Sequence, residues 1–152
     1  MAEHIYTGSL EIALPRDEVF SFFANAENLE RITPPELGFQ IITPTPIEMK
    51  AGALIDYRIS MRGIPMKWRT EITKWDPPFE FIDTQLRGPY KQWIHRHSFT
   101  ETEHGTTMIE DEVRYRLPLE SLGDIARFFV EREIKNIFDY RQKTVAEVFK
   151  KQ

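Results

Sequence analysis

The sequence predicts one α+β domain spanning residues 1–152, in which a curved antiparallel sheet of about seven strands is crossed by a long C-terminal helix. Three observations favour this fold class. Apolar and polar residues alternate in several short runs, as they do in half-buried strands. Gly and Pro residues separate these runs at the spacing of successive antiparallel strands. After Pro118 the apolar residues recur three or four positions apart, which is the period of an amphipathic helix.

One strand and two short helices are expected in the first 35 residues. Residues 6–14 alternate between apolar and polar, so they predict the first strand. Pro15 suits the start of a helix that runs through Phe23, because the missing N–H of proline is not needed there. A second short helix is expected at residues 26–32. It ends before Pro34, since the residue before a proline avoids helical angles.

Six further strands are expected between residues 39 and 117. Because successive side chains of a strand point to opposite faces, the alternation also predicts which residues share a face. The sets expected to share a face are Ile64, Met66, Trp68, Thr70 and Ile72 in one strand, Trp93, His95, His97 and Phe99 in another, and Ile109, Asp111, Val113 and Tyr115 in a third.

The C-terminal segment predicts one helix of about 30 residues, which would be about 45 Å long at 1.5 Å per residue. A helix of that length can lie across a whole sheet, and a curved sheet covered by one helix leaves an interior space that side chains or a ligand must fill. We therefore expect a cavity between the sheet and this helix. The apolar residues at helical spacing are Leu122, Ile125, Ala126, Phe129, Ile134, Ile137, Phe138, Val145, Val148 and Phe149, and the face of Ile125, Phe129, Ile134, Ile137 and Phe138 is expected to pack on the sheet.

Composition excludes several classes of protein. The chain has no cysteine, so disulfides, thiolate metal sites and cysteine nucleophiles are excluded. The net charge of −4 argues against a nucleic-acid partner, which would call for a basic excess. No apolar run approaches the length of a membrane span, and the N-terminus does not read as a secretory signal. We expect a soluble, cytoplasmic protein without stable membrane insertion.

Several motifs, in their order along the chain, suggest a family. They are Pro15 with Val19-Phe20 and Phe22-Phe23, Glu27-Asn28-Leu29 before Pro34-Pro35, Gly88-Pro89-Tyr90 before Trp93, His95, His97 and Phe99, and Gly105-Thr106-Thr107 with Asp111, Tyr115 and Pro118. In these features the chain resembles the START-like (SRPBCC) superfamily of helix-grip proteins, and within it the bacterial polyketide cyclase/dehydrase-like ligand-binding proteins. The resemblance implies a fold and a ligand pocket, with the short helices near its entrance, but it implies no particular reaction.

Two histidines on one apolar face are the main candidate for a functional site. His95 and His97 are two residues apart, so both leave the same face of their strand. If the next strand follows a hairpin turn near residues 102–105, Asp111 lies opposite one of the two histidines. Asp83, on the preceding strand, reaches His95 only if the connection at residues 87–90 is longer than a strict two-residue turn.

Four readings of this cluster remain open from the sequence. It is the polar end of a ligand cavity, an acid/base pair of His95 and Asp111, a metal site of two histidines and a carboxylate, or a set of buried polar groups that satisfy one another. We favour the first reading and expect no metal, because the spacing specifies no third ligand, and no other cofactor. The function expected is binding of a small hydrophobic or amphipathic molecule, such as a lipid or a polyketide-like aromatic metabolite. The alternative is a cyclase or dehydratase that uses the His–Asp pair on a polyketide-like substrate.

Aromatic side chains complete the expected ligand-binding set. Phe129 and its neighbours on the long helix are expected to touch a ligand only incidentally, because their main role is packing. The full set of expected ligand-binding residues is Trp68, Asp83, Trp93, His95, His97, Asp111, Tyr115 and Phe129.

A homodimer through a sheet edge or the exposed helix face is a third class of function, although no exposed apolar stripe favours it.

Overall fold

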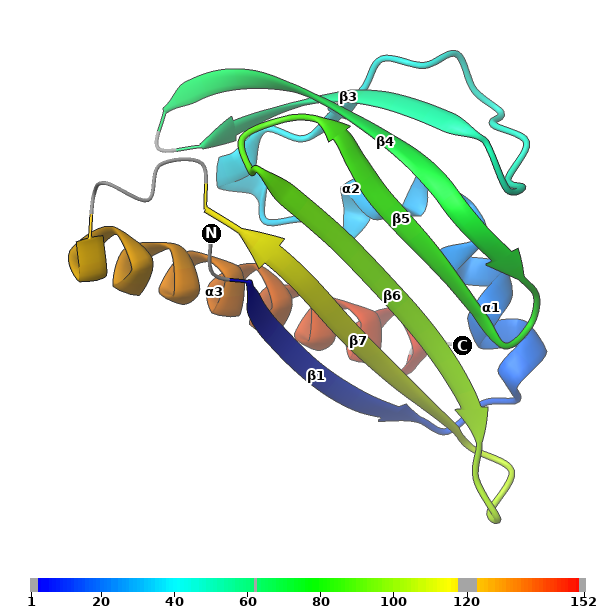
Figure 1. Cartoon of the computed structure of the whole chain (residues 1–152). Helices are drawn as coiled ribbons and strands as arrows, with labels where there is room; N and C mark the ends of the chain where they lie inside the picture. The colour runs from blue at the N-terminus through cyan, green and yellow to red at the C-terminus, as the bar shows by residue number, and fades with distance from the viewer. Residues whose placement is uncertain (1–2, 62, 118–122, 151–152) are drawn as a thin grey trace.

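Seven antiparallel strands form one curved sheet in the order β1-β7-β6-β5-β4-β3-β2, and α3 lies along its inner side together with α1 and α2 (Figure 1). The computed structural model describes residues 3–61, 63–117 and 123–150. This arrangement is the predicted helix-grip α+β fold. The elements in chain order are β1 (His4–Ile12), α1 (Arg16–Phe23), α2 (Asn28–Arg31), the 3-10 helix η1 (Pro35–Leu37), β2 (Gln40–Ile41), β3 (Leu54–Met61), β4 (Ile64–Asp76), β5 (Glu80–Arg87), β6 (Gln92–Glu101), β7 (Thr107–Arg116) and α3 (Gly123–Lys150).

The N-terminal elements form close to where the sequence predicts them. Strand β1 ends at Ile12, two residues early, because the Leu14 N–H turns back to the carbonyl of Ile12. Helix α1 follows Pro15 and carries two acidic residues in its first turn, where they suit the helix dipole. Helix α2 is only four residues long, and η1 after it is an element the alternation pattern did not indicate.

The six strands expected between residues 39 and 117 are all present, although β2 has only two residues. Trp68, Thr70 and Ile72 are buried on one face of β4, as predicted, but Ile64 at the start of this strand is 59% exposed. Ile64 pairs with Met61 beside the β3–β4 turn, so it lies at the hairpin tip beyond the core. Ile64 therefore shares the face of Trp68 but lies outside the core.

Helix α3 has 28 residues and would span about 42 Å, close to the predicted length. Ile134, Phe138, Val145 and Phe149 are buried against the rest of the core. Phe129 is 50% exposed, because it lies nine residues, or about two and a half helical turns, before the buried Phe138 and so on the opposite side of the helix. The prediction that Phe129 packs on the sheet was wrong, and Leu122 and the side chains of Ile125 and Ala126 lie outside the described residues.

The apolar core therefore lies between the sheet and the helices. Val113 of β7 and Phe138 of α3 are 0% and 1% exposed, and Phe99 of β6 is 2% exposed. The ring of Phe20 on α1 contacts that of Phe99 edge-on, which joins α1 to the centre of the sheet. Among the described residues, no helix combines the length and the apolar character needed to cross a membrane.

Candidate functional site

A cavity of about 130 Å³ lies between the sheet, α2, η1 and α3. Its walls are mostly aliphatic and aromatic. Polar side chains join them mainly in two regions: Asp83, His95, His97 and Arg141 where β5 and β6 pass under α3, and Asn25, Asn28 and Thr33 around α2. Enclosed sites with a few polar groups among apolar ones are typical of small-molecule binding sites. The principal lining residues are Phe22, Phe23, Leu29, Ile32, Leu37, Phe39, Ile55, Tyr57, Ile59, Trp68, Ile72, Phe81, Asp83, Tyr90, Trp93, His95, His97, Ile137, Phe138 and Arg141.

Three neighbouring strands supply the polar cluster of this wall. His95 and His97 are alternate residues of β6, so their side chains leave the same face. In the sheet register Asp83 of β5 lies opposite His95, and Asp111 of β7 lies opposite His97. The connection between β5 and β6 spans residues 88–91, which is longer than a two-residue turn and sets this register. The two conditional placements of Asp83 and Asp111 made from the sequence are thus met.

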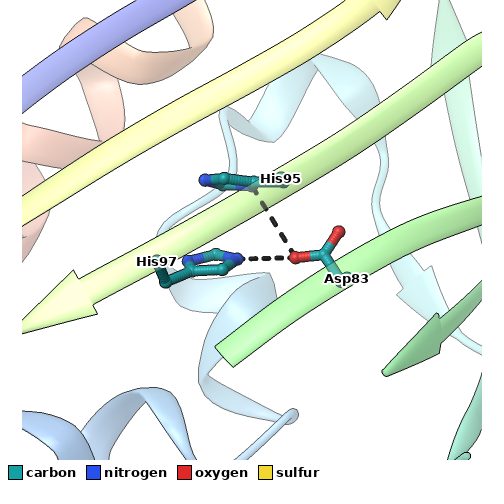
Figure 2. Close-up of side chains that lie close together, drawn as sticks. All are labelled: Asp83, His95 and His97. Carbon is teal, nitrogen blue, oxygen red and sulfur yellow. Dashed lines mark hydrogen bonds and ion pairs between the residues drawn. The ribbon is translucent and has the colours of Figure 1, made fainter. Parts of the chain in front are cut away.

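Each aspartate forms its short hydrogen bond with the histidine diagonal to it. His97 Nε2 forms a hydrogen bond of 2.6 Å with Asp83 Oδ2 (Figure 2). His95 Nε2 lies 2.7 Å from Asp111 Oδ1. The remaining nitrogens face the other carboxylates at longer range: His95 Nδ1 is 3.7 Å from Asp83 Oδ2, and His97 Nδ1 is 3.6 Å from Asp111 Oδ1. Two carboxylates therefore bracket the pair of imidazole rings, one on each side.

The two imidazole rings are stacked, and apolar rings enclose them. Their centroids are 3.6 Å apart, and Phe81 stacks on the outer side of His97 at 4.0 Å. Phe138 of α3 meets the ring of His95 edge-on at 5.3 Å. His95 and His97 are only 3% and 6% exposed, so this polar cluster lies inside the molecule.

Burial and pairing set the charges of the cluster. Burial lowers the pKa of His97, and the adjacent His95 lowers it further, while the bond to Asp83 opposes both. Burial raises the pKa of Asp83 and of Asp111, but hydrogen bonds from the histidines, together with the positive charge of Arg141, outweigh it and bring both values below the usual range. Both carboxylates are therefore ionised near neutral pH, and the His97 imidazole is neutral.

The structure brings five of the eight predicted ligand-binding residues to the cavity. They are Trp68, Asp83, Trp93, His95 and His97. Asp111 lies behind the histidines and does not line the cavity, and Tyr115 is 3% exposed within the core. Phe129 is away from the cavity, for the reason given for its exposure.

Arg141 is a cavity residue that sequence reasoning missed. Its guanidinium lies 4.9 Å from the Phe138 ring centroid, and its charge contributes to the low pKa values of Asp83 and Asp111. The signal was available, because Arg141 follows Phe138 by three positions and so lies on the same helix face. This signal was missed because most of the other charged residues of this helix are exposed to water.

Comparisons with known proteins agree with this fold. Residues 12–139 match the family described as polyketide cyclase / dehydrase and lipid transport. Among curated proteins, none matches the sequence. The fold is similar to that of the Zhui aromatase/cyclase from Streptomyces sp. R1128, with a TM-score of 0.75 and 15% identity over 98% of this chain and 94% of that one.

Two further solved structures show the same architecture at low identity. A START superfamily protein from Mycobacterium smegmatis has a TM-score of 0.71 and 12% identity, and covers 95% of this chain and 99% of its own. Major latex-like protein 151 from Panax ginseng has a TM-score of 0.68 and 14% identity, with 97% of each chain covered. The family match spans most of the sequence, and the predicted START-like resemblance is confirmed. The chain belongs to the polyketide cyclase/dehydrase and lipid transport family.

Proposed function

We propose that this protein binds a small hydrophobic or amphipathic molecule, such as a lipid or a polyketide-like aromatic metabolite, between its sheet and α3. The observation that carries the proposal is the cavity itself, which is lined mainly by apolar side chains and has a polar wall formed by β5 and β6. Removing apolar ligand surface from water supplies about 25 cal/mol per Å². Burial of apolar surface would therefore provide most of the affinity, and the polar wall would provide orientation.

The volume of the cavity limits the size of the ligand that it can hold. About 130 Å³ is comparable to engineered cavities of about 150 Å³ that hold one benzene molecule. A ligand of one or two rings fits with little rearrangement, whereas a long acyl chain or a polycyclic molecule requires α2, η1 or α3 to move. We infer that the preferred ligand is compact and carries an oxygen function near one end.

Two polar features support an oxygen-bearing ligand. The histidine–aspartate cluster offers both donors and acceptors at the wall formed by β5 and β6. Trp68, another lining residue, has a buried indole N–H without an acceptor among the described residues. A buried donor normally has a partner, so an acceptor brought by the ligand would remove this deficit.

The first experiment is native mass spectrometry of the freshly purified protein, compared with its denatured mass. Release of a small hydrophobic compound on unfolding would support the proposal and give the class of ligand. If the protein carries nothing, calorimetric titration with β-naphthol, a compact aromatic with one hydroxyl group, tests the empty cavity. Absence of both a released compound and β-naphthol binding would contradict the proposal.

Filling the cavity is expected to abolish this binding. Ile59 lines the cavity and is 7% exposed, so Ile59→Phe places extra volume where the ligand would lie. We expect the affinity for β-naphthol to fall by at least about tenfold, since tenfold corresponds to only about 1.4 kcal/mol. Ile5→Phe is the matched control, because Ile5 is 54% exposed on β1 and outside the cavity. Equal affinity in both variants would place the ligand elsewhere.

The short His95–Asp111 bond favours a second candidate, a cyclase or dehydratase acting on a polyketide-like substrate. In this scheme Asp111 accepts a hydrogen bond from the Nε2–H of His95, and Nδ1 removes a proton from a carbon between two carbonyl groups. The enolate carbon attacks another carbonyl group of the same chain, so that a C–C bond forms, the C=O π bond breaks, and the proton on Nδ1 passes to the resulting alkoxide. Elimination of that hydroxyl group with a proton from the adjacent carbon forms a C=C bond and releases water.

The test is incubation with a poly-β-ketone analogue and detection of a product lighter by one water. His95→Phe is expected to lower the rate by about 100-fold or more, the usual contribution of a general base. His104→Ala is the control, because His104 lies exposed in the β6–β7 turn. Product formation at the same rate in buffer alone, or with His95→Phe, would count against the enzymatic candidate.

A homodimer and a cytoplasmic location stay predictions from the sequence.

A further inference from the structure

The nitrogen and oxygen atoms of the cavity wall are arranged as a set of metal ligands. One ligand atom each from Asp83, His95 and His97 lies within 4.8 Å of the others (Figure 2). We infer that these three side chains form a binding site for a divalent first-row transition metal ion, with the remaining coordination position facing the cavity. The sequence indicated the two histidines but no third ligand, and the sheet register supplies it by placing Asp83 opposite His95.

Each histidine presents a different nitrogen to each carboxylate. His97 Nε2 and His95 Nδ1 face Asp83 Oδ2, at 2.6 and 3.7 Å, whereas His95 Nε2 and His97 Nδ1 face Asp111 Oδ1, at 2.7 and 3.6 Å. An ion beside Asp83 would therefore take one nitrogen from each ring. The opposite nitrogens, His95 Nε2 and His97 Nδ1, would then carry the ring protons and donate them to Asp111, which requires the proton of His97 to move from Nε2 to Nδ1.

Asp111 thus has the place of an outer carboxylate that orients the histidines. Metal-binding histidines generally donate their second N–H to such a group, which sets the tautomer and strengthens the ligand. The position of Asp111 agrees with this role, because the three proposed ligands line the cavity and Asp111 does not. The carboxylate of Asp83 faces the cavity, and that of Asp111 lies behind the imidazole rings.

The distances require only a local adjustment. Zinc bonds of about 2.1 Å in a tetrahedron place neighbouring ligand atoms about 3.4 Å apart. The hydrogen bond of 2.6 Å between His97 and Asp83 must open as the ion replaces the shared proton, and the separation of 3.7 Å between His95 and Asp83 must close slightly. His97 remains neutral through this exchange by carrying its proton on Nδ1.

The ligand set favours a transition metal. Asp83 and Asp111 place a carboxylate on each side of the two imidazole rings, and carboxylate oxygens attract a divalent cation. Imidazole nitrogens with one carboxylate suit Zn²⁺, Fe²⁺ and their neighbours better than Mg²⁺ or Ca²⁺. Three protein ligands with an open position are typical of metal sites that meet a ligand or substrate rather than purely structural ones. Here the open position would hold water or an oxygen of the molecule in the cavity.

Titration of the untagged, EDTA-treated protein with Co²⁺ tests the inference, because the visible absorption of Co²⁺ reports its coordination. We expect saturation at one ion per chain, an intense spectrum of four- or five-coordinate Co²⁺, and displacement by Zn²⁺. Asp83→Asn and His97→Ala are expected to lose saturable binding. Asp111→Asn should retain the stoichiometry but bind about 10- to 100-fold more weakly, as expected for an outer partner.

His104→Ala is the matched control, since it removes an exposed histidine and should leave the titration unchanged. Circular dichroism tests whether each variant is folded. If His97→Ala does not fold, Asp83→Asn alone provides the test of the site. No saturable Co²⁺ or Zn²⁺ binding by the original protein, or unchanged binding in Asp83→Asn, would overturn the inference. The cavity-binding proposal is judged separately, because β-naphthol binding is measured in the metal-free protein.

Discussion

Phe138→Ala is expected to lower the free energy of unfolding by about 3–5 kcal/mol, the usual cost of removing a buried aromatic side chain. Phe138 is 1% exposed and connects α3 to the sheet, where its ring stacks on Tyr6 at 4.6 Å and meets His95 edge-on. Alanine would leave a void that neighbours on two elements could fill only in part. Urea unfolding followed by circular dichroism measures the effect.

The same helix provides the controls for this prediction. Phe128 and Phe129 are 58% and 50% exposed, so truncating either to alanine should change stability by no more than about 0.5 kcal/mol. A loss for Phe129→Ala as large as that for Phe138→Ala would mean that the first turns of α3 are covered in solution. Because Phe138 also lines the cavity, Phe138→Ala should additionally admit bulkier aromatic ligands than β-naphthol.

Asp111→Ala is expected to destabilise the protein by about 3 kcal/mol, because it leaves the N–H of His95 buried without an acceptor. His95 is 3% exposed, so water is a poor substitute for the lost carboxylate. Asp111→Asn should recover most of the loss, since its amide oxygen still accepts the hydrogen bond of 2.7 Å. Thermal and urea unfolding of the three proteins give the comparison.

The control for Asp111 lies next to it on β7. Glu110 points to the opposite face and is exposed, so Glu110→Ala should be nearly neutral. Similar losses for Glu110→Ala and Asp111→Ala would show that general charge, rather than the buried bond, carries the stability. A neutral Asp111→Ala would show that His95 finds another partner.

The faces of the strands could be read from the sequence because their period of two is strict. Trp68, His95 and Asp111 all lie on the predicted inner face, whereas the placement of Asp83 beside His95 depended on the length of the β5–β6 connection, which the sequence left open. The diagonal pairing of the cluster could not be read, because strand register places backbones opposite one another and leaves side-chain rotamers open. The exposure of Phe129 could have been read from the helical period, because nine residues are about two and a half turns and place it opposite Phe138.

The cavity was expected in outline but not in size. Its volume depends on how closely α3 approaches the sheet and on how α2 and η1 close the inner side, and these distances arise from packing between segments far apart in the sequence. Arg141 illustrates the same limit. Its position on the face of Phe138 was visible in the sequence, but only the packing of α3 shows that the guanidinium acts on carboxylates of β5 and β7.

The diagonal His–Asp bonds also discriminate between alternative alignments of the three strands. Sliding β6 by two residues against its neighbours would keep every apolar side chain on the inner face, so hydrophobic patterning alone opposes such a slip only weakly. The same slip would separate either His95 from Asp111 or His97 from Asp83, depending on its direction, and so break one of the two buried hydrogen bonds. The buried hydrogen bonds of the cluster therefore favour one alignment of β5, β6 and β7 over the shifted alternatives.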